Sequence, residues 1–370
     1  MNSLRDEIRT LFSGMGMPYE KVSIIIALVI SVFFTVLFGN NFAKDSPVVV
    51  IDLDHTRYSR EFADKIDATE YMKVVGIVET PADPAGFFYE DRAYAVICLP
   101  RDFEKDVYSG GSPTIGLYCD KTNAALDADI IEAMNEIVGI ENAQNTPKGA
   151  GAITLNSRNL FSPLGSSSNA TTQGFLFFFS AMFFTFATIG MVPRLRLTYQ
   201  WEETLASGNP FGLLARLIPY MGCLLIALML GLVILRYWGD MIIAGNFLLF
   251  LCFQILLIFD IGMLSLLFGW NAANPGVASS RMILFIPGGF ILGGVTSPIS
   301  HLSAWAIQFS HLFPLTWQYH FTRDILQRGA GLTDITHQTA AFLLYSLAIF
   351  VIFCLRFESD RRKLLSATDK

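Results

Sequence analysis

Long apolar runs dominate the pattern of the chain. The first, Val22 to Gly39, holds 18 residues without a charge, and at about 1.5 Å per residue a helix of this length crosses the hydrocarbon core of a bilayer. No clear small-residue cleavage site follows it, so an uncleaved anchor is favoured over a signal peptide. Five further runs occupy residues 174–192, 213–235, 241–270, 282–299 and 340–355. The pattern predicts an α-helical membrane protein with six transmembrane helices.

The stretch between the first two runs, residues 40–172, has a different periodicity. Short β-type runs alternate with helical stretches; the expected strands are residues 48–51, 72–78, 94–99 and 114–118, and the expected helices are 59–68 and 124–141. A stretch rich in Gly, Ser and Asn, residues 145–168, is expected to be a loop that returns the chain to the membrane. We therefore expect an α/β domain inserted between the first and second transmembrane helices.

The two ends of the chain have patterns of their own. Residues 1–21 place apolar side chains on one helical face, which predicts a cytoplasmic amphipathic helix lying on the membrane surface. The first transmembrane helix then takes residues 22–39, the other five fall within residues 173–356, and residues 357–370 form a cytoplasmic tail.

The distribution of charge indicates the sidedness. Of the 370 residues 52% are hydrophobic and only 16% are charged, an excess that favours lipid as part of the solvent. Residues 40–172 hold 20 acidic and 11 basic residues, whereas basic residues elsewhere flank the apolar runs: Arg5, Arg9, Lys21, Arg194, Arg196, Arg281, Arg356, Arg361, Arg362 and Lys363. These lie on one side if both termini are cytoplasmic, with Arg236 as the exception, and the α/β domain is then extracytoplasmic. No basic patch interleaved with aromatic residues indicates a nucleic-acid partner.

Five cysteines are present, and three of them, Cys223, Cys252 and Cys354, lie in apolar runs as packing residues. The other two, Cys98 and Cys119, lie in the α/β block. Outside the cytoplasm they can pair as a disulfide; the alternative is two separate buried thiols.

Two features of the spans are candidates for a translocation path. Asp260 is an acid deep inside an apolar run, where a lone carboxylate is costly and tends to face an interior or a partner. It either lines the path or forms a structural hydrogen bond to a neighbouring helix. Pro287, Gly288 and Gly289 make the fifth span either flexible or closely packed.

The stretch "SPVVVIDLDHTRYS", residues 46–59, offers an enzymatic alternative. It resembles the first motif of the haloacid-dehalogenase phosphatases, in which one Asp attacks phosphate. That chemistry also needs a later Lys and a distal acidic pair to hold Mg²⁺, and no such pair is evident before the next span. The simpler interpretation is a strand ending in a turn, with Asp54 or Thr56 capping the helix that follows.

A second resemblance extends over nearly the whole chain. "VVVIDLDHTRYSREFADKI" and "RAYAVICLPRDFEKDVYSGGSPTIGLYCDKTNAALDADI" resemble the extracytoplasmic domain of ABC-2 type permeases, the membrane subunits of bacterial ATP-driven exporters. Three membrane-side segments agree and follow in the same order: "WEETLASGNPFGLLARLIPY", "GGFILGGVTSPISHLSAW" and "FPLTWQYHFTRDILQRGAGL".

This resemblance implies a permease subunit of a bacterial inner-membrane exporter that binds no cofactor itself. The chain has no G-x-x-x-x-G-K-[ST] loop, so ATP and Mg²⁺ belong to a separate ATPase. The implied coupling helix, near residues 200–210, docks on that ATPase. Trp201 is expected as an aromatic anchor, Glu202 and Glu203 as charge partners, and the segment also includes Thr204, Leu205 and Pro210.

The resemblance also implies a re-entrant exit segment near residues 296–330, which includes Pro298, Pro314, Thr316 and Arg323. Six spans form too little wall for a path, so we expect a dimer with a second copy or a paralogue. A periplasmic adaptor is a further candidate partner. The histidines of this segment, His301, His311 and His320, have spacings that fit no compact metal motif.

The rival interpretation is a membrane receptor or secretion scaffold that transports nothing. Such a protein has no need for an ATPase-docking helix, so that helix distinguishes the two interpretations.

Overall fold

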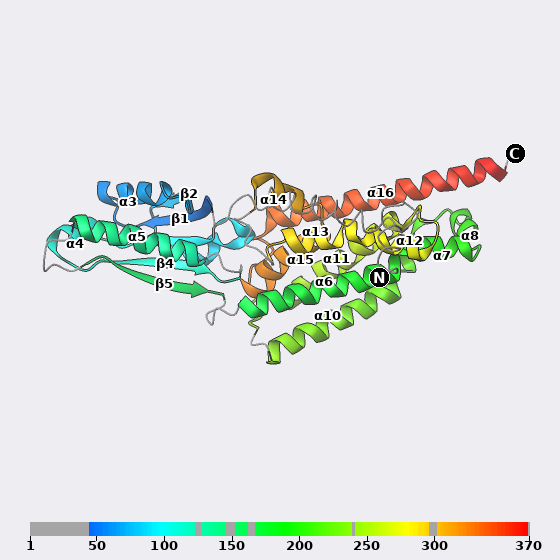
Figure 1. The fold of residues 1–370 in the computed structure, drawn as a ribbon, viewed down its shortest axis with the longest axis horizontal. Coiled ribbons are helices and arrows are strands. Elements are labelled where there is room, and N and C mark those ends of the chain that lie inside the picture. Colours follow the sequence, from blue (N-terminus) through cyan, green and yellow to red (C-terminus); the bar gives the residue numbers. More distant parts are fainter. Residues whose placement is uncertain are drawn as a thin grey trace, which may run out of the picture.

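The structure, a computed structural model, describes residues 44–122, 127–145, 152–161, 167–238, 241–295 and 302–368. The molecule is elongated, with an α/β domain at one end and long apolar helices at the other (Figure 1). The predicted surface helix, residues 1–21, and the predicted first span, residues 22–39, lie outside the described residues.

A five-stranded sheet in the order β2-β1-β3-β4-β5 forms the centre of the α/β domain. Its strands are β1 (Ser46–Asp52), β2 (Met72–Val78), β3 (Ala95–Leu99), β4 (Thr114–Asp120) and β5 (Thr154–Leu160). β1 runs parallel to both β2 and β3, β4 is antiparallel to β3, and β5 is parallel to β4. The apolar run of β1 is explained by its central place, since it is buried on both faces of the sheet.

The four predicted strands are present, but the prediction of a loop over residues 145–168 is wrong in part. β5 lies within it, as an edge strand whose side chains are mostly polar and exposed. Backbone pairing with β4 and a hydroxyl contact of 2.9 Å between Thr114 and Thr154 hold it in register, and Leu155 and Leu160 are its partly buried apolar residues. A strand without a buried face leaves no alternation in the sequence.

Three helices cover one face of the sheet: α3 (Arg57–Asp67), α4 (Phe103–Ser109) and α5 (Asp127–Asn145). Two short 3₁₀ turns, η1 (Pro84–Phe87) and η2 (Tyr89–Asp91), bring Phe87 and Phe88 against the other face. α3 starts as predicted from Thr56, whose hydroxyl accepts a 3.2 Å hydrogen bond from Ser59 N.

Among the described residues, five helical segments are long and apolar enough to cross a membrane. They are built from α6 (Ser167–Ile189) with α7 (Met191–Leu197), α10 (Ile218–Trp238), α11 (Phe247–Gly269), the broken segment Pro275–Leu292, and α16 (Thr336–Thr368). They match the second to sixth predicted spans. Short helices connect them: α8 (Trp201–Ala206), α9 (Pro210–Ala215), α14 (Ala304–Ser310), α15 (Pro314–Phe321) and the π-helical turn η5 (Thr322–Gln327).

The fifth predicted span differs most from its prediction. It begins at Pro275, seven residues before the expected start, and is divided into α12 (Pro275–Ser280), η3 (Arg281–Leu284) and α13 (Ile286–Leu292). Asn274 caps its start by accepting a 2.9 Å hydrogen bond from Val277 N. Arg281, which was expected just before the span, therefore lies inside it. Its guanidinium donates a hydrogen bond to the Phe268 carbonyl at 2.9 Å.

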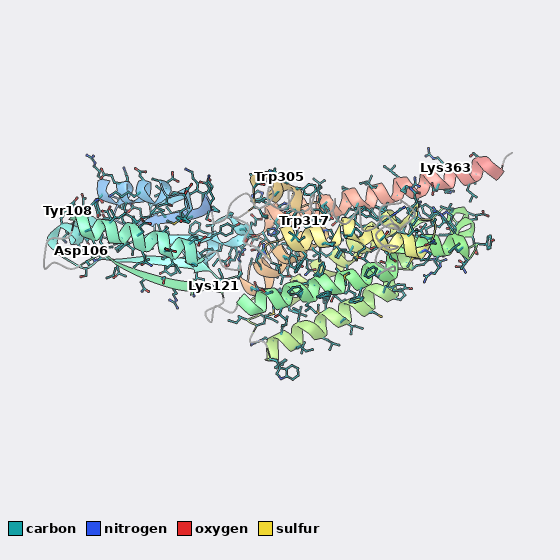
Figure 2. The ribbon with its side chains drawn as sticks, viewed as in Figure 1. Asp106, Tyr108, Lys121, Trp305, Trp317 and Lys363 are labelled. Carbon is teal, nitrogen blue, oxygen red and sulfur yellow. The ribbon has the colours of Figure 1, made fainter. Side chains whose placement is uncertain are left out.

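The two ends of the membrane part carry different markers. Trp305 and Trp317 lie near the α/β domain, and Lys363 lies at the opposite end, together with α7 and α8 (Figures 1 and 2). We call this opposite end the α8 end. Trp305 is half-exposed, as is common for tryptophans at a membrane boundary.

Glycines allow the spans to approach closely. A Cβ on Gly269, at the end of α11, would collide with the Ile189 carbonyl of α6, and one on Gly262 would lie 2.8 Å from Leu217. Small residues at such crossings are how membrane helices gain van der Waals contact without a hydrophobic driving force.

We expect Gly269→Ala to lower the free energy of unfolding by about 2 kcal/mol, because the new methyl group overpacks the α6–α11 crossing. The thermal unfolding midpoint in detergent measures this. The control is Gly222→Ala on α10, where an added Cβ meets nothing within 4 Å and better helix propensity predicts an unchanged or slightly higher midpoint. Equal midpoints for both variants would contradict the packing argument.

Candidate functional site

Short helices at the α8 end connect two of the spans. α7, α8 and α9 follow one another between α6 and α10, at the end farthest from the α/β domain (Figure 1). Tyr199 precedes α8 with a positive φ of 56°, and Gly208 follows it at 66°. These left-handed positions turn the chain sharply on both sides of the helix, so α8 projects as a separate element.

The two faces of α8 have different surroundings. Trp201, Thr204 and Leu205 are buried, whereas Glu202 and Glu203 are exposed and form no ion pair with any described residue. Trp201 packs edge-on against Trp270 with ring centroids 5.3 Å apart, and the Arg196 guanidinium lies 5.3 Å over its ring. Within this chain Trp201 therefore packs α8 against the spans, whereas the two glutamates face outward; its expected role as an anchor for a partner stays a prediction.

The neighbouring residues of the segment support this geometry. The Thr204 hydroxyl donates to the Gln200 carbonyl at 2.7 Å, within the helix. Pro210 is the first residue of α9, behind Asn209, whose side chain accepts from Phe211 N at 2.9 Å. The ring of Phe211 is exposed and adds an apolar side chain to the outward surface.

Asp260 lies fully buried in α11 and faces α16. Its Oδ2 accepts a 2.6 Å hydrogen bond from the Ser346 hydroxyl, and its Oδ1 has no hydrogen-bond partner within the part of the chain that the structure describes. Of the two interpretations of Asp260, the structure supports the structural one, a hydrogen bond to a neighbouring helix. Gln254, one and a half turns earlier, accepts from Gln318 at 2.7 Å, a polar link that the sequence did not indicate.

The glycines of α13 are packed against the segment that leads to the last span. A Cβ on Gly288 would lie 2.5 Å from the Phe313 ring, and one on Gly289 would lie 2.8 Å from Leu315. Pro287 stands in the first turn of α13. Of the two interpretations of these glycines, flexibility and close packing, the structure therefore supports close packing.

The predicted exit segment is mostly buried. Pro314 and Thr316 lie in α15, all of whose side chains are buried, and Arg323 lies in η5. Pro298 and His301 lie outside the described residues. His311 and His320 stack with ring centroids 5.6 Å apart, but no group of three potential metal ligands occurs among the described residues.

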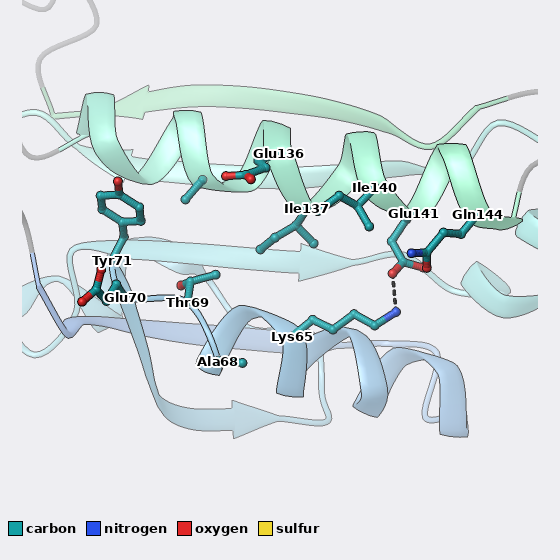
Figure 3. Close-up of a pocket in the computed structure, with 11 residues that line it drawn as sticks. Lys65, Ala68, Thr69, Glu70, Tyr71, Glu136, Ile137, Ile140, Glu141 and Gln144 are labelled. Atoms are coloured by element: carbon teal, nitrogen blue, oxygen red, sulfur yellow. Dashed lines mark hydrogen bonds and ion pairs between the residues drawn. The ribbon is translucent and has the colours of Figure 1, made fainter.

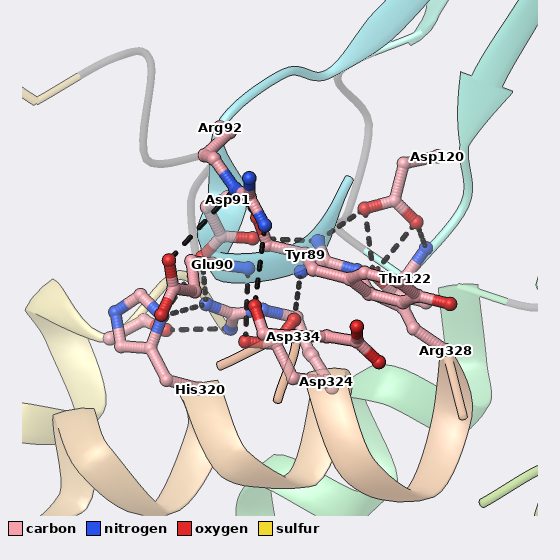
Figure 4. Close-up of polar contacts among 12 residues, drawn as sticks. Tyr89, Glu90, Asp91, Arg92, Asp120, Thr122, His320, Asp324, Arg328 and Asp334 are labelled. Carbon is pink, nitrogen blue, oxygen red and sulfur yellow. Dashed lines mark hydrogen bonds and ion pairs between the residues drawn. The ribbon is translucent and has the colours of Figure 1, made fainter. Parts of the chain in front are cut away.

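A buried set of charges lies where the α/β domain meets this segment (Figure 4). We call it the junction cluster, and its members are Asp91, Asp120, His320, Arg323, Asp324 and Arg328. The Arg328 guanidinium is fully buried and pairs with Asp324 and Asp91 at 2.6 Å each and with Asp120. Arg323 reaches Asp91 at 3.0 Å and also donates to the Gly293 carbonyl at 3.0 Å.

The π-helical turn η5 explains how both arginines reach the same domain. In an α-helix, residues five apart point about 140° away from each other. In η5 the Arg328 amide donates to the Arg323 carbonyl at 2.8 Å, an i→i+5 hydrogen bond that brings the two side chains close to one face. π-turns of this kind are frequent at functional sites.

The neighbouring arginines keep the buried Asp91 carboxylate ionised. Burial by itself would raise the pKa of Asp91, but Arg323, Arg328 and the hydrogen bond from His320 hold the pKa of that carboxyl well below its usual range. Of the cluster, the sequence analysis named Arg323 as an exit residue but did not single out Asp91, Asp120, Asp324 or Arg328. The sequence pattern that could have indicated the cluster is the group Arg323, Asp324 and Arg328 in a largely apolar stretch, together with the excess of acidic residues in the α/β domain.

The turn after β1 has a structural arrangement. Asp52 is nearly fully buried and accepts hydrogen bonds from the Asp54 and His55 amides, at 3.0 and 3.1 Å, and from the Ser59 hydroxyl at 2.8 Å. Asp54 accepts from Thr56 Oγ1 at 2.6 Å and from Glu104 N at 3.0 Å. These contacts occupy the carboxylates in shaping the turn, which favours the capping interpretation over a phosphatase nucleophile.

The two cysteines of the α/β domain do not form a disulfide. In the β3–β4 pairing Cys98 lies opposite Gly116, whereas Cys119 lies opposite Ala95. Cys98 packs on the face of the sheet that carries η1 and η2, and Cys119 packs on the helix-covered face. The possible bridge is thus excluded by register, because the side chains point to opposite sides.

The α/β domain also carries an open groove of 460 Å³ between α3 and α5 (Figure 3). Apolar side chains such as Ile137 and Ile140 line it, with Glu136 and Glu70 at its edge. The buried Glu141 pairs with Lys65 and accepts a hydrogen bond from the Tyr58 hydroxyl, so it joins α3 to α5 within the lining of the groove.

A protein family and a solved domain are similar to this chain. The sequence profile of the family described as "ABC-2 family transporter protein" matches residues 22–356. A crystal structure of a domain attributed to an ABC type-2 transporter of Thermotoga maritima MSB8 is similar over 31% of this chain and 85% of its own, with 13% identity and a TM-score of 0.27. No curated protein sequence matches.

We expect Arg328→Met to lower the free energy of unfolding by about 3–5 kcal/mol, because it leaves three buried aspartates without their shared partner. Thermal unfolding in detergent, with limited proteolysis at the junction, measures the loss. The matched control is Arg92→Met, which removes an exposed guanidinium that donates to the Asp334 carbonyl at 3.2 Å across the same junction. It should cost less than about 1 kcal/mol; a wild-type midpoint for the Arg328 variant would contradict the role of the cluster.

Proposed function

The chain belongs to the ABC-2 family of transporter proteins, and from this we propose that it is the permease subunit of an ATP-driven exporter in a bacterial inner membrane. The ATPase, with its ATP and Mg²⁺, is a separate polypeptide. Both termini are cytoplasmic, and the α/β domain is periplasmic.

The basic residues support this orientation. Arg194 and Arg196 of α7, and Arg356, Arg361 and Arg362 of α16, all lie at the α8 end. An excess of Lys and Arg is typical of the cytoplasmic side of a membrane protein. The α8 end is then cytoplasmic and accessible to a soluble ATPase.

The observation that carries the proposal is the two-faced α8. One face is packed on the spans through Trp201, and the other presents Glu202 and Glu203 without partners in the described part of the chain. Such a helix can accept basic side chains from an ATPase and can pass on its movement, because its rear face is attached to the spans.

Export itself is expected to use two permease copies. α10 leaves much of its apolar surface uncovered, including Ile226, Leu230 and Val233, which suits contact with lipid or with a second permease. ATP binding would draw two ATPases together and displace the α8 helices, and the spans would open a path between the copies. A periplasmic adaptor is a further partner consistent with the acidic α/β domain.

Double charge reversal, Glu202→Lys with Glu203→Lys, should weaken co-purification of the partner ATPase, by about tenfold in affinity. Pull-down from membranes solubilised in detergent, followed by a titration, measures this. The control reverses two exposed acids of α3, Glu61→Lys with Asp64→Lys, at the other end of the molecule.

Undiminished co-purification of the α8 variant would contradict the docking assignment. If the wild-type chain captures no ATPase at all, the receptor or scaffold interpretation gains instead.

A further inference from the structure

The rear face of α8 rests on a compact group of side chains from three other elements. Trp270 follows α11, and its indole Nε1 donates to Asp360 Oδ2 of α16 at 2.9 Å. Asp360 also lies 3.7 Å from Arg196 of α7, which in turn covers the Trp201 ring. Trp270 is almost fully buried, with its ring centroid 5.3 Å from that of Trp201 and 5.8 Å from that of Phe353.

We propose that Trp270 and Asp360 are positioning residues that transmit a displacement of α8 to α11 and α16 as a pair. This inference rests on the proposed function, since it concerns how docking of the ATPase moves the spans. Neither residue faces the ATPase in this arrangement; each acts through α8.

The first argument is geometric. Trp270, directly after α11, contacts both Trp201 of α8 and Asp360 of α16. Arg356 lies 5.8 Å over the Trp270 ring and 3.5 Å from Asp360, and it donates to the Asn271 side chain at 2.7 Å. A displacement of Trp201 would therefore act on the Trp270–Asp360 pair, which links α11 to α16.

The second argument is where these two helices lead. α16 spans 33 residues, about 50 Å, and α11 runs beside it from the α8 end toward the α/β domain (Figure 1). Near their other ends Phe253 of α11 stacks on Phe321 at 4.2 Å, and Phe342 of α16 meets the same ring at 5.1 Å. Phe321 is the last residue of α15, next to η5 and the junction cluster.

The third argument is rigidity between the two ends. The Asp260–Ser346 hydrogen bond ties α11 to α16 in the middle of the membrane part. Helices joined at both ends and the centre are expected to move together rather than slide independently.

The experiment measures the response at the far end of the route. The permease–ATPase complex is reconstituted in nanodiscs, with and without ATP and orthovanadate, and hydrogen exchange is followed by mass spectrometry in peptides covering residues 314–327. The wild-type complex should show a trapping-dependent change in deuterium uptake there. Trp270→Phe keeps an aromatic ring but removes the donor, and Asp360→Asn keeps the size but removes the charge.

In both variants we expect the ATPase to remain bound and to hydrolyse ATP, while the trapping-dependent change over residues 314–327 falls to less than half. Asp360→Glu should restore it. The matched control is Glu358→Gln, which removes an acid one half-turn away that pairs only with Arg361 and Arg362 of its own helix among the described residues; its response should equal that of the wild type.

A full response in both variants would overturn the inference, as would a wild-type complex whose trapping leaves residues 314–327 unchanged. Loss of ATPase binding in Trp270→Phe and Asp360→Asn would also overturn it, by placing these residues in the docking surface. Failure of the wild-type chain to bind any ATPase would instead refute the proposed function, so the two failures are distinguishable.

Discussion

Two buried arginines and three aspartates at the junction cluster hold the α/β domain against the membrane helices. Asp91 and Asp120 come from the domain, whereas Arg323, Asp324 and Arg328 come from the segment before the last span. Charges taken out of water are tolerated only when the geometry satisfies them, so each partner restricts where the other can sit. The orientation of the domain, and with it the register of α15 against α13, follows from this constraint.

The opposite end of the membrane part is organised by a different chemistry. There the contacts are aromatic rings with guanidinium groups above them, Trp201 with Arg196 and Trp270 with Arg356, and a carboxylate that several cations share. Such contacts are weaker and more adaptable than a fully buried ion pair. The molecule thus has a firmly fixed junction between the α/β domain and the spans, and more adaptable contacts at the α8 end, which suits the movement that we propose for α8.

The local pattern of apolar and polar residues was enough to predict much of the fold. The apolar runs predicted the described spans, and the strand of four branched residues, Val48 to Ile51, was evident because it is buried on both faces. β5 was not predictable, since an exposed edge strand has no apolar period. The junction cluster and the Trp201–Trp270 contact were missed for a related reason. They join residues far apart in the chain, and the pattern of one segment does not indicate which distant residue it will contact. Which way the Trp201 side chain points depends on the Trp270 ring, 69 positions later in the chain.

The distance along the chain between the partners at the junction has a consequence for biogenesis. Arg323 and Arg328 lie more than 200 residues after Asp120, with four of the described spans between them. A ribosome makes these segments in order, so the aspartates of the domain are synthesised well before the two arginines that pair with them. Attachment of the domain to the spans is therefore a late assembly step, and a chain truncated before Arg323 lacks both arginine partners of the domain's aspartates.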